Sequence, residues 1–168
     1  MNVRPLSTTD KADLLTWTND RRLWPYILKH RFVNGVEHET FFEQLLTDKA
    51  REYFILQTDR GDSAGLCGLT GIDLINSKAE LFIFISDQAS QGKGLGSRAM
   101  DFLINYAFHQ LFLHKLSLRV LCDNEKAITL YQHKGFDVDG ILRDDFRDES
   151  GFKNVQIMSL IKGSECVK

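Results

Sequence analysis

Length, composition and charge limit what this chain can be. Its 168 residues, 43% hydrophobic and 26% charged, predict one globular domain spanning residues 1–168 with a sizeable core. A net charge of -2 gives no field that attracts nucleic acid, and no apolar run is long enough to span a membrane. The first residues lack the apolar core of a signal peptide, so a cytoplasmic protein is expected. The spacing of cysteines and histidines matches neither a disulfide framework nor a metal site, and no metal is predicted.

The first 34 residues predict a strand, a helix and an irregular segment. The strand is expected over residues 3–6. Thr9 or Asp10 then caps a helix with apolar residues at helical spacing. Residues 19–34 are expected to be irregular, because Pro25 interrupts any long helix.

The next fifty residues predict a second helix and three strands. The helix has its apolar face at residues 41–46, and His38 is expected on its surface. Two strands, 53–58 and 64–75, are joined by a turn-rich connection. The following strand, 79–86, is apolar on both faces, so it should lie in the centre of a sheet.

The second half alternates helices and strands and closes with a hairpin. A helix follows from the apolar spacing of residues 100–111, and a strand from residues 115–121. A short helix covers 124–136, and strands at 138–142 and 155–161 are expected to pair. The order of elements along the whole chain predicts a mixed α/β sandwich.

A glycine-rich run, Gln91 to Gly96, lies between a predicted strand and a predicted helix. Glycines let the backbone approach an anion closely, and the unpaired amides of a first helical turn point towards it. The lysine stands in the wrong place for a P-loop, and the third glycine comes one residue early for the dinucleotide pattern G-x-G-x-x-G. The remaining pattern, Q-x-x-G-x-G, predicts a phosphate-binding loop, with a turn that binds nothing as the alternative.

This loop resembles the acetyl-CoA pyrophosphate loop of the GNAT acetyltransferase superfamily. A second run, Asn124 to Phe136, is similar to the family signature N-x-x-A-x-x-x-Y-x-x-x-G-F. Asn124 is a favourable helix N-cap, and Gly135 stands where a left-handed residue ends a helix. The resemblance covers nearly the whole chain. It implies the GNAT fold, a central mixed, twisted sheet of about six or seven strands flanked by about four helices.

The resemblance also implies acetyl-CoA as co-substrate and direct attack of an amine on its thioester in a ternary complex. Strand backbone would hold the pantetheine like an added strand, and the glycine-rich loop would hold the pyrophosphate. Tyr131 would donate a proton to the leaving sulfur, unless it is a core tyrosine anchored by its ring. The implied coenzyme-binding residues are Phe84, Ile85, Ser86, Gln91, Gly92, Lys93, Gly94, Leu95, Gly96, Ser97 and Asn124.

Glu80, on the predicted central strand, is the expected base. A desolvated carboxylate there would have a raised pKa, suited to accepting the proton of the amine. Two alternatives remain open. Glu80 could instead be a strand-edge residue paired with a lysine, and the family also uses chains of water in place of a single carboxylate.

The acceptor amine is predicted from local charge. Family members of this length act on polyamines, amino-sugar nucleotides, protein N-termini or antibiotics. A cationic run around residues 21–31 would attract a diphosphate and repel a polyamine, so an amino-sugar nucleotide is the predicted acceptor, with Arg21, Arg22 and Arg31 binding it. The acidic stretch 137–149 favours spermidine or spermine instead. A protein N-terminus is a third candidate.

A protein of another class, a sensor that binds acetyl-CoA without turnover, also fits the coenzyme motifs. Tyr131 and the loop at 25–36 favour an enzyme, because a sensor needs neither a proton donor nor an acceptor pocket. The expected partners are a small-molecule amine and possibly further copies of the chain. Neither nucleic acid nor a membrane is expected.

Overall fold

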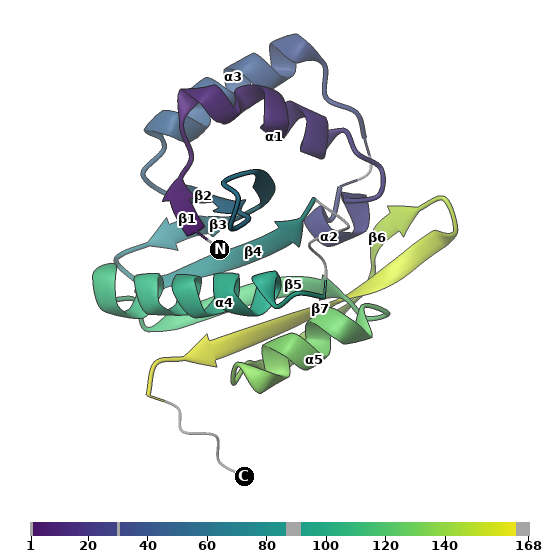
Figure 1. Ribbon diagram of the computed structural model, residues 1–168. Coiled ribbons are helices and arrows are strands. Elements are labelled where there is room, and N and C mark those ends of the chain that lie inside the picture. The colour runs from purple at the N-terminus through teal and green to yellow at the C-terminus, as the bar shows by residue number, and fades with distance from the viewer. Residues whose placement is uncertain (1, 30, 87–91, 164–168) are drawn as a thin grey trace.

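One mixed sheet of seven strands organises the protein. The structure, a computed structural model, describes residues 2–29, 31–86 and 92–163. The spatial order of the strands is β1-β2-β3-β4-β5-β7-β6 (Figure 1). Neighbouring strands are antiparallel except β4 and β5, which are parallel. The strands are β1 (Asn2–Pro5), β2 (Glu52–Gln57), β3 (Ser63–Asp73), β4 (Lys78–Ile85), β5 (Lys115–Leu121), β6 (Asp137–Asp148) and β7 (Gly151–Ile161).

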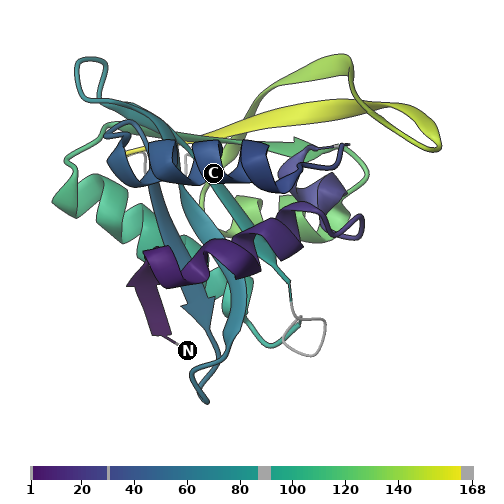
Figure 2. The same cartoon turned by 90° about the horizontal axis from the view of Figure 1, so that it is seen from above.

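Helices cover both faces of this sheet. α1, α2 and α3 lie on one face, and α4 and α5 on the other (Figure 1). Seen from above, α1 and α3 lie across the strands (Figure 2). A seven-stranded mixed sheet between two helical layers confirms the predicted fold class. The helical segments are η1 (Thr8–Asp10), α1 (Lys11–Thr18), α2 (Trp24–Ile27), α3 (Gly35–Thr47), α4 (Leu95–Asn105), its π-helical continuation η3 (Tyr106–Gln110) and α5 (Glu125–His133).

Side chains along β4 point alternately into two separate cores. Leu81 packs with Met100 and Leu103 of α4 beneath the sheet. Phe84, three residues on, packs with Trp17 of α1 and the apolar face of α3 above it. Because successive strand residues point to opposite faces, a strand covered on both sides must be apolar on both sides. The predicted central position of this strand is therefore confirmed.

The N-terminal third follows the sequence prediction at its first helix and differs from it further on. Asp10, one of the two predicted caps, is the N-cap of α1, and the short segment η1 precedes it with Ser7 as its own N-cap. The Ser7 backbone N–H donates to the Asp10 carboxylate over 2.8 Å. Residues 19–34 also contain a short helix, α2, with Pro25 in its first turn. A first helical turn has no need of the N–H that proline lacks, so Pro25 begins this helix and does not prevent one.

His38 and the closing hairpin also differ from prediction. His38 is buried, with 2% of its surface exposed, and its Nε2 lies 2.8 Å from the carbonyl oxygen of Lys11. It was predicted on the surface because its neighbours Glu37 and Glu39 are charged. β6 and β7 extend well beyond the predicted 138–142 and 155–161, since polar residues continue their ladder on exposed faces. In the described part of the chain, no helix is long and apolar enough to cross a membrane.

Candidate functional site

A cleft opens where β4 and β5 separate. These parallel strands are paired only from Lys78 to Glu80, against residues 115–117. On its other side β4 stays paired with β3 as far as Ile85. Residues 81–85 therefore face β5 without a ladder partner on that strand. Backbone groups left open in this way can pair with an extended ligand, as a free sheet edge pairs with a peptide.

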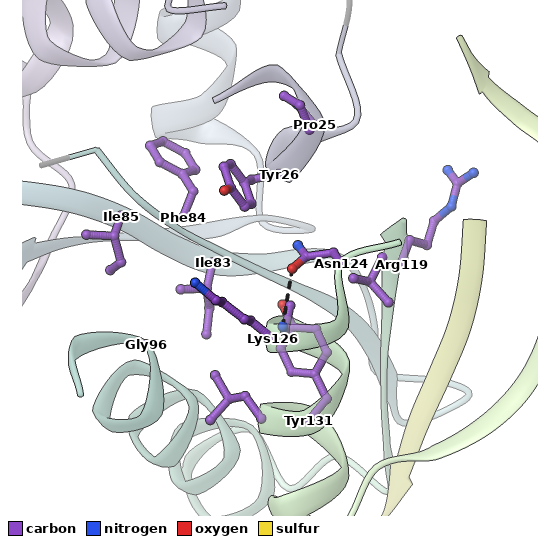
Figure 3. Close-up of a pocket in the computed structure, with 13 residues that line it drawn as sticks. Pro25, Tyr26, Ile83, Phe84, Ile85, Gly96, Arg119, Asn124, Lys126 and Tyr131 are labelled. Atoms are coloured by element: carbon purple, nitrogen blue, oxygen red, sulfur yellow. Dashed lines mark hydrogen bonds between the residues drawn. The ribbon is translucent and has the colours of Figure 1, made fainter. Parts of the chain in front are cut away.

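A cavity of about 230 Å³ occupies this cleft (Figure 3). β4, β5, α5, α2 and the start of α4 form its walls. Four of the residues predicted to bind the coenzyme line it, while Ser86 lies at its edge with its backbone N–H bonded to Ala64. The four are Phe84, Ile85, Gly96 and Asn124.

The glycine-rich loop ends in an open helix start. Gly92 and Gly94 both have left-handed backbones, with φ of 75° and 77°, a conformation that costs glycine little. Gly94 is the N-cap of α4, and no side chain caps this helix. The amides of its first turn, at residues 95–97, can therefore serve an anion. Lys93 is exposed beside them, and Gln91 lies outside the described residues.

α5 brings Asn124 and Tyr131 to the opposite wall. The Asn124 carboxamide oxygen accepts from the Ala127 N–H at 3.2 Å, so this residue caps the helix as predicted. Gly135 ends it with φ of 88°, and the Phe136 N–H reaches back to the Tyr131 carbonyl at 3.0 Å. Burial raises the pKa of the Tyr131 phenol to about 12. This phenol therefore keeps its proton at neutral pH and can act as an acid.

A second cavity, of about 530 Å³, lies between the sheet and the helices α1 to α3. It shares Tyr26, Phe84 and Arg119 with the first, so the two cavities meet at these side chains. Glu80 lines the second cavity. The residue is exposed on β4, where partial desolvation raises the pKa of its carboxyl and the charge of Arg119 opposes that shift. Among the described residues we find no hydrogen-bond or ion-pair partner for the Glu80 carboxylate, so it is available to a ligand.

The three arginines predicted to bind the acceptor do not converge. Arg31 lines the second cavity but pairs with Glu37 at 3.2 Å. Arg22 is exposed and paired with Asp20 at 2.6 Å. Arg21 lies beside another surface hollow, where it pairs with Glu149 at 3.1 Å and stacks on aromatic rings. His30, from the same run, lies outside the described residues. Each arginine therefore already has a carboxylate partner.

Sequence reasoning missed two residues at the site, Tyr26 and Arg119, which line both cavities. Lys29, a member of the predicted cationic run, lines the second cavity. Arg119 had a usable signal, because with Lys115 and Ser117 it forms the polar side of the alternating strand Lys115–Leu121. Tyr26 had none, since only the packing of α2 over the sheet brings it there. Among the described residues, no cluster of His, Cys, Asp or Glu is arranged to hold a metal.

An extended, phosphate-bearing thioester needs a strand-like channel, an anion site at one end and a proton donor near its sulfur. The opening between β4 and β5 presents unpaired strand backbone, the start of α4 and the Tyr131 phenol, an arrangement that fits the class of acyltransferases that use coenzyme A. The family model described as "Acetyltransferase (GNAT) domain" matches residues 1–137, and the chain belongs to that family. It is therefore an enzyme that transfers acetyl groups to nitrogen.

Relatives agree with this assignment. The chain is 32% identical over 162 residues to a spermidine N(1)-acetyltransferase of Escherichia coli (strain K12), covering 96% of this chain and 86% of that protein. It is 27% identical over 137 residues to acetyltransferase PseH of Campylobacter jejuni, covering 82% and 83%. A crystal structure of spermidine N-acetyltransferase from Vibrio cholerae with CoA and spermine has a TM-score of 0.89 at 28% identity, covering 95% and 94%.

Proposed function

We propose that this enzyme transfers the acetyl group of acetyl-CoA to a primary amine of a polyamine, such as spermidine or spermine. The observation that carries the proposal is the open Glu80 carboxylate in the cavity beside the coenzyme cleft. An ammonium group is the natural partner of such a carboxylate. The similarity to spermidine N-acetyltransferases supports the same acceptor.

Compensated charges weaken the case for an amino-sugar nucleotide, the acceptor that the sequence predicted. An anionic acceptor needs guanidinium groups that are free to form two-point bonds to phosphate. Arg21, Arg22 and Arg31 each already face a carboxylate. Displacing such a pair would leave the displaced carboxylate next to the incoming phosphate, which is unfavourable. The cationic run therefore offers less attraction to a diphosphate than its sequence suggests.

The coenzyme arrangement follows from the cleft. In our proposal the unpaired β4 backbone near Phe84 and Ile85 holds the pantetheine arm, and the α4 amides bind the pyrophosphate. The Asn124 carboxamide oxygen accepts the hydrogen bond that caps α5, which leaves the side-chain N–H groups to donate to the ligand. This arrangement brings the thioester to the junction of the two cavities, near Tyr26 and Arg119.

Three proton transfers accompany the chemistry. Glu80 takes a proton from the acceptor ammonium, which leaves a neutral amine able to attack the thioester carbonyl. As the new C–N bond forms and the C–S bond breaks, Tyr131 gives its proton to the departing sulfur. The nitrogen sheds a second proton, which restores the Tyr131 phenol through solvent. The net products are the amide, the free thiol and one proton.

A second candidate acceptor, a small anionic amine such as an amino-sugar nucleotide, is favoured by Lys29. Its side chain lines the same cavity, and burial together with Arg31 lowers its pKa. An incoming phosphate would pair with this ammonium and favour its charged form, whereas a polycation would be repelled by it. The two candidates therefore make opposite forecasts for one substitution.

The test compares spermidine, spermine and a UDP-amino-sugar at equal concentration, by thiol release from acetyl-CoA. With Lys29→Met, kcat/KM for a polyamine should stay constant or rise by about fivefold, the equivalent of roughly 1 kcal/mol. Lys49→Met, an exposed lysine outside these cavities, serves as the control. Turnover of the sugar nucleotide alone, with a raised KM in Lys29→Met, would replace the polyamine with the second candidate.

A further inference from the structure

Arg119 stands at the passage between the two cavities. Glu80 is directly opposite Ser117 in the last pair between β4 and β5, and Arg119 follows two residues later on the same face. Its guanidinium is therefore the first cation beyond Glu80 along the opening cleft. In Figure 3 the side chain extends away from Asn124 and from the α5 wall. A contact on the other side of Arg119 keeps this cation from turning towards Glu80.

Asp145 of β6 holds the Arg119 guanidinium, with Oδ2 accepting from Nη2. The strand is irregular at this point, since its register against β7 shifts between Leu142 and Phe146. Asp144 has a left-handed φ of 53°, and its N–H is held by the Asn154 side chain at 3.0 Å. Such a bulge bends a strand and re-aims its side chains. Buried Phe146 fixes the far end of the bulge against Leu121 and Val155.

The contact between Arg119 and Asp145 affects the basicity of Glu80 in one direction. A guanidinium near Glu80 stabilises the carboxylate and makes it a weaker base. A carboxylate that shares the guanidinium offsets part of this effect. The other charged and titratable groups lining the same cavity stand on different elements, so a change at β6 leaves them in place. These groups are Tyr26, Lys29, Arg31, Glu37, His38 and Tyr53.

We propose that Asp145 is a positioning residue that holds Arg119 at the far side of the passage, so that Glu80 stays basic enough to deprotonate the acceptor amine. The inference rests on the proposed function, in which Glu80 is the base. Asp145 acts through Arg119, and it does not line either cavity. The β6 bulge is the structural feature that brings it there.

The experiment measures the acidic limb of the kcat/KM–pH profile in two variants that should shift it in opposite directions. Asp145→Asn frees Arg119 and should lower the apparent pKa of this limb by about 0.5–1 unit. Arg119→Gln should raise it by a similar amount. Asp145→Glu should restore the wild-type limb. The matched control is Asp139→Asn, which breaks another ion pair of a β6 aspartate, with Lys115 at 2.8 Å, and should leave the limb unchanged.

The double variant tests whether Asp145 acts through Arg119. With Arg119→Gln already present, Asp145→Asn should add little or no further shift. Equal shifts from Asp145→Asn with and without Arg119 would overturn the proposal, as would a limb that does not move in either single variant.

A second measurement separates failure of this inference from failure of the proposed function. The side-chain carboxyl ¹³C signal of Glu80, assigned by its loss in Glu80→Gln, reports its titration without any substrate. Opposite shifts of this signal in the two variants support the proposal even if no tested amine is acetylated. An unmoved signal in both variants refutes it, whatever the enzyme turns over.

Discussion

Replacing Gly96 with alanine should separate coenzyme binding from folding. Gly96 lies in the first turn of α4 and lines the cleft cavity. A Cβ built there meets only Leu130 Cδ2, at 3.6 Å, which is an ordinary van der Waals contact. The backbone is helical, so alanine introduces no left-handed strain. The unliganded protein should therefore keep its stability or gain up to about 1 kcal/mol, because alanine is the better helix former.

The liganded protein should respond in the opposite way. At a hundred times its Kd, acetyl-CoA adds roughly 2.7 kcal/mol to the free energy of unfolding. For a chain of this size that gain corresponds to a rise in Tm of roughly 5–10 °C. A methyl group at Gly96 keeps the pyrophosphate from the α4 amides. If Kd rises a hundredfold, the gain at the same ligand concentration falls to about 0.4 kcal/mol.

Thermal melting with and without acetyl-CoA measures both effects. Gly140→Ala is the control, since a Cβ there meets nothing within 4 Å and the residue lies on β6, away from the cleft. It should keep the full ligand-induced rise. A full rise in Gly96→Ala as well would refute the assignment of the coenzyme phosphates to this helix start. Gly94→Asp, which puts an anion at the N-cap, should lose the rise completely.

Three further predictions concern catalysis, acid stability and the α5 motif. Tyr131→Phe should lower kcat by about 10² and leave the Kd of acetyl-CoA unchanged; unchanged turnover would make Tyr131 a core residue. The Arg4 hydrogen bond lowers the pKa of Asp10 in the folded protein. Ionised Asp10 therefore stabilises the fold fully above its unfolded pKa of about 3.9, and this stabilisation is lost as the pH falls through the lower folded pKa. Asp10→Asn should cost about 1–3 kcal/mol in urea unfolding at pH 7, and a cost that did not shrink in acid would contradict this reasoning. Gly135→Ala forces a left-handed alanine against Leu160 and should cost about 1–2 kcal/mol; a neutral result would argue against the helix-ending role.

Local patterns predicted the parts of the site that a single segment encodes. The glycine-rich run and the capped helix at Asn124 need only neighbouring residues, because turns and caps are closed by short-range bonds. The apolar run of β4 likewise predicted a strand covered on both faces. The residue set implied for the coenzyme cleft stays a prediction, although Phe84, Ile85, Gly96 and Asn124 do share its cavity.

The charges around the acceptor cavity depend on residues that are far apart in sequence. Arg21 has its carboxylate partner 128 positions away, and Arg119 has its own 26 positions away. A run of like charges therefore says little about the field in a cavity, because distant strands supply the counter-charges.

The sequence by itself determined the family, the strand-and-helix order and the glycine conformations that the loop needs, since these follow from periodicity and short-range sterics. The tertiary structure alone decided which charges remain open. The separation of β4 from β5 creates the cleft, the position of α2 brings Tyr26 to it, and Lys29 lies in the cavity beside it. The β6 bulge gives Arg119 its partner. Electrostatic attraction depends on distance in space and on burial, and neither can be read from positions along a chain.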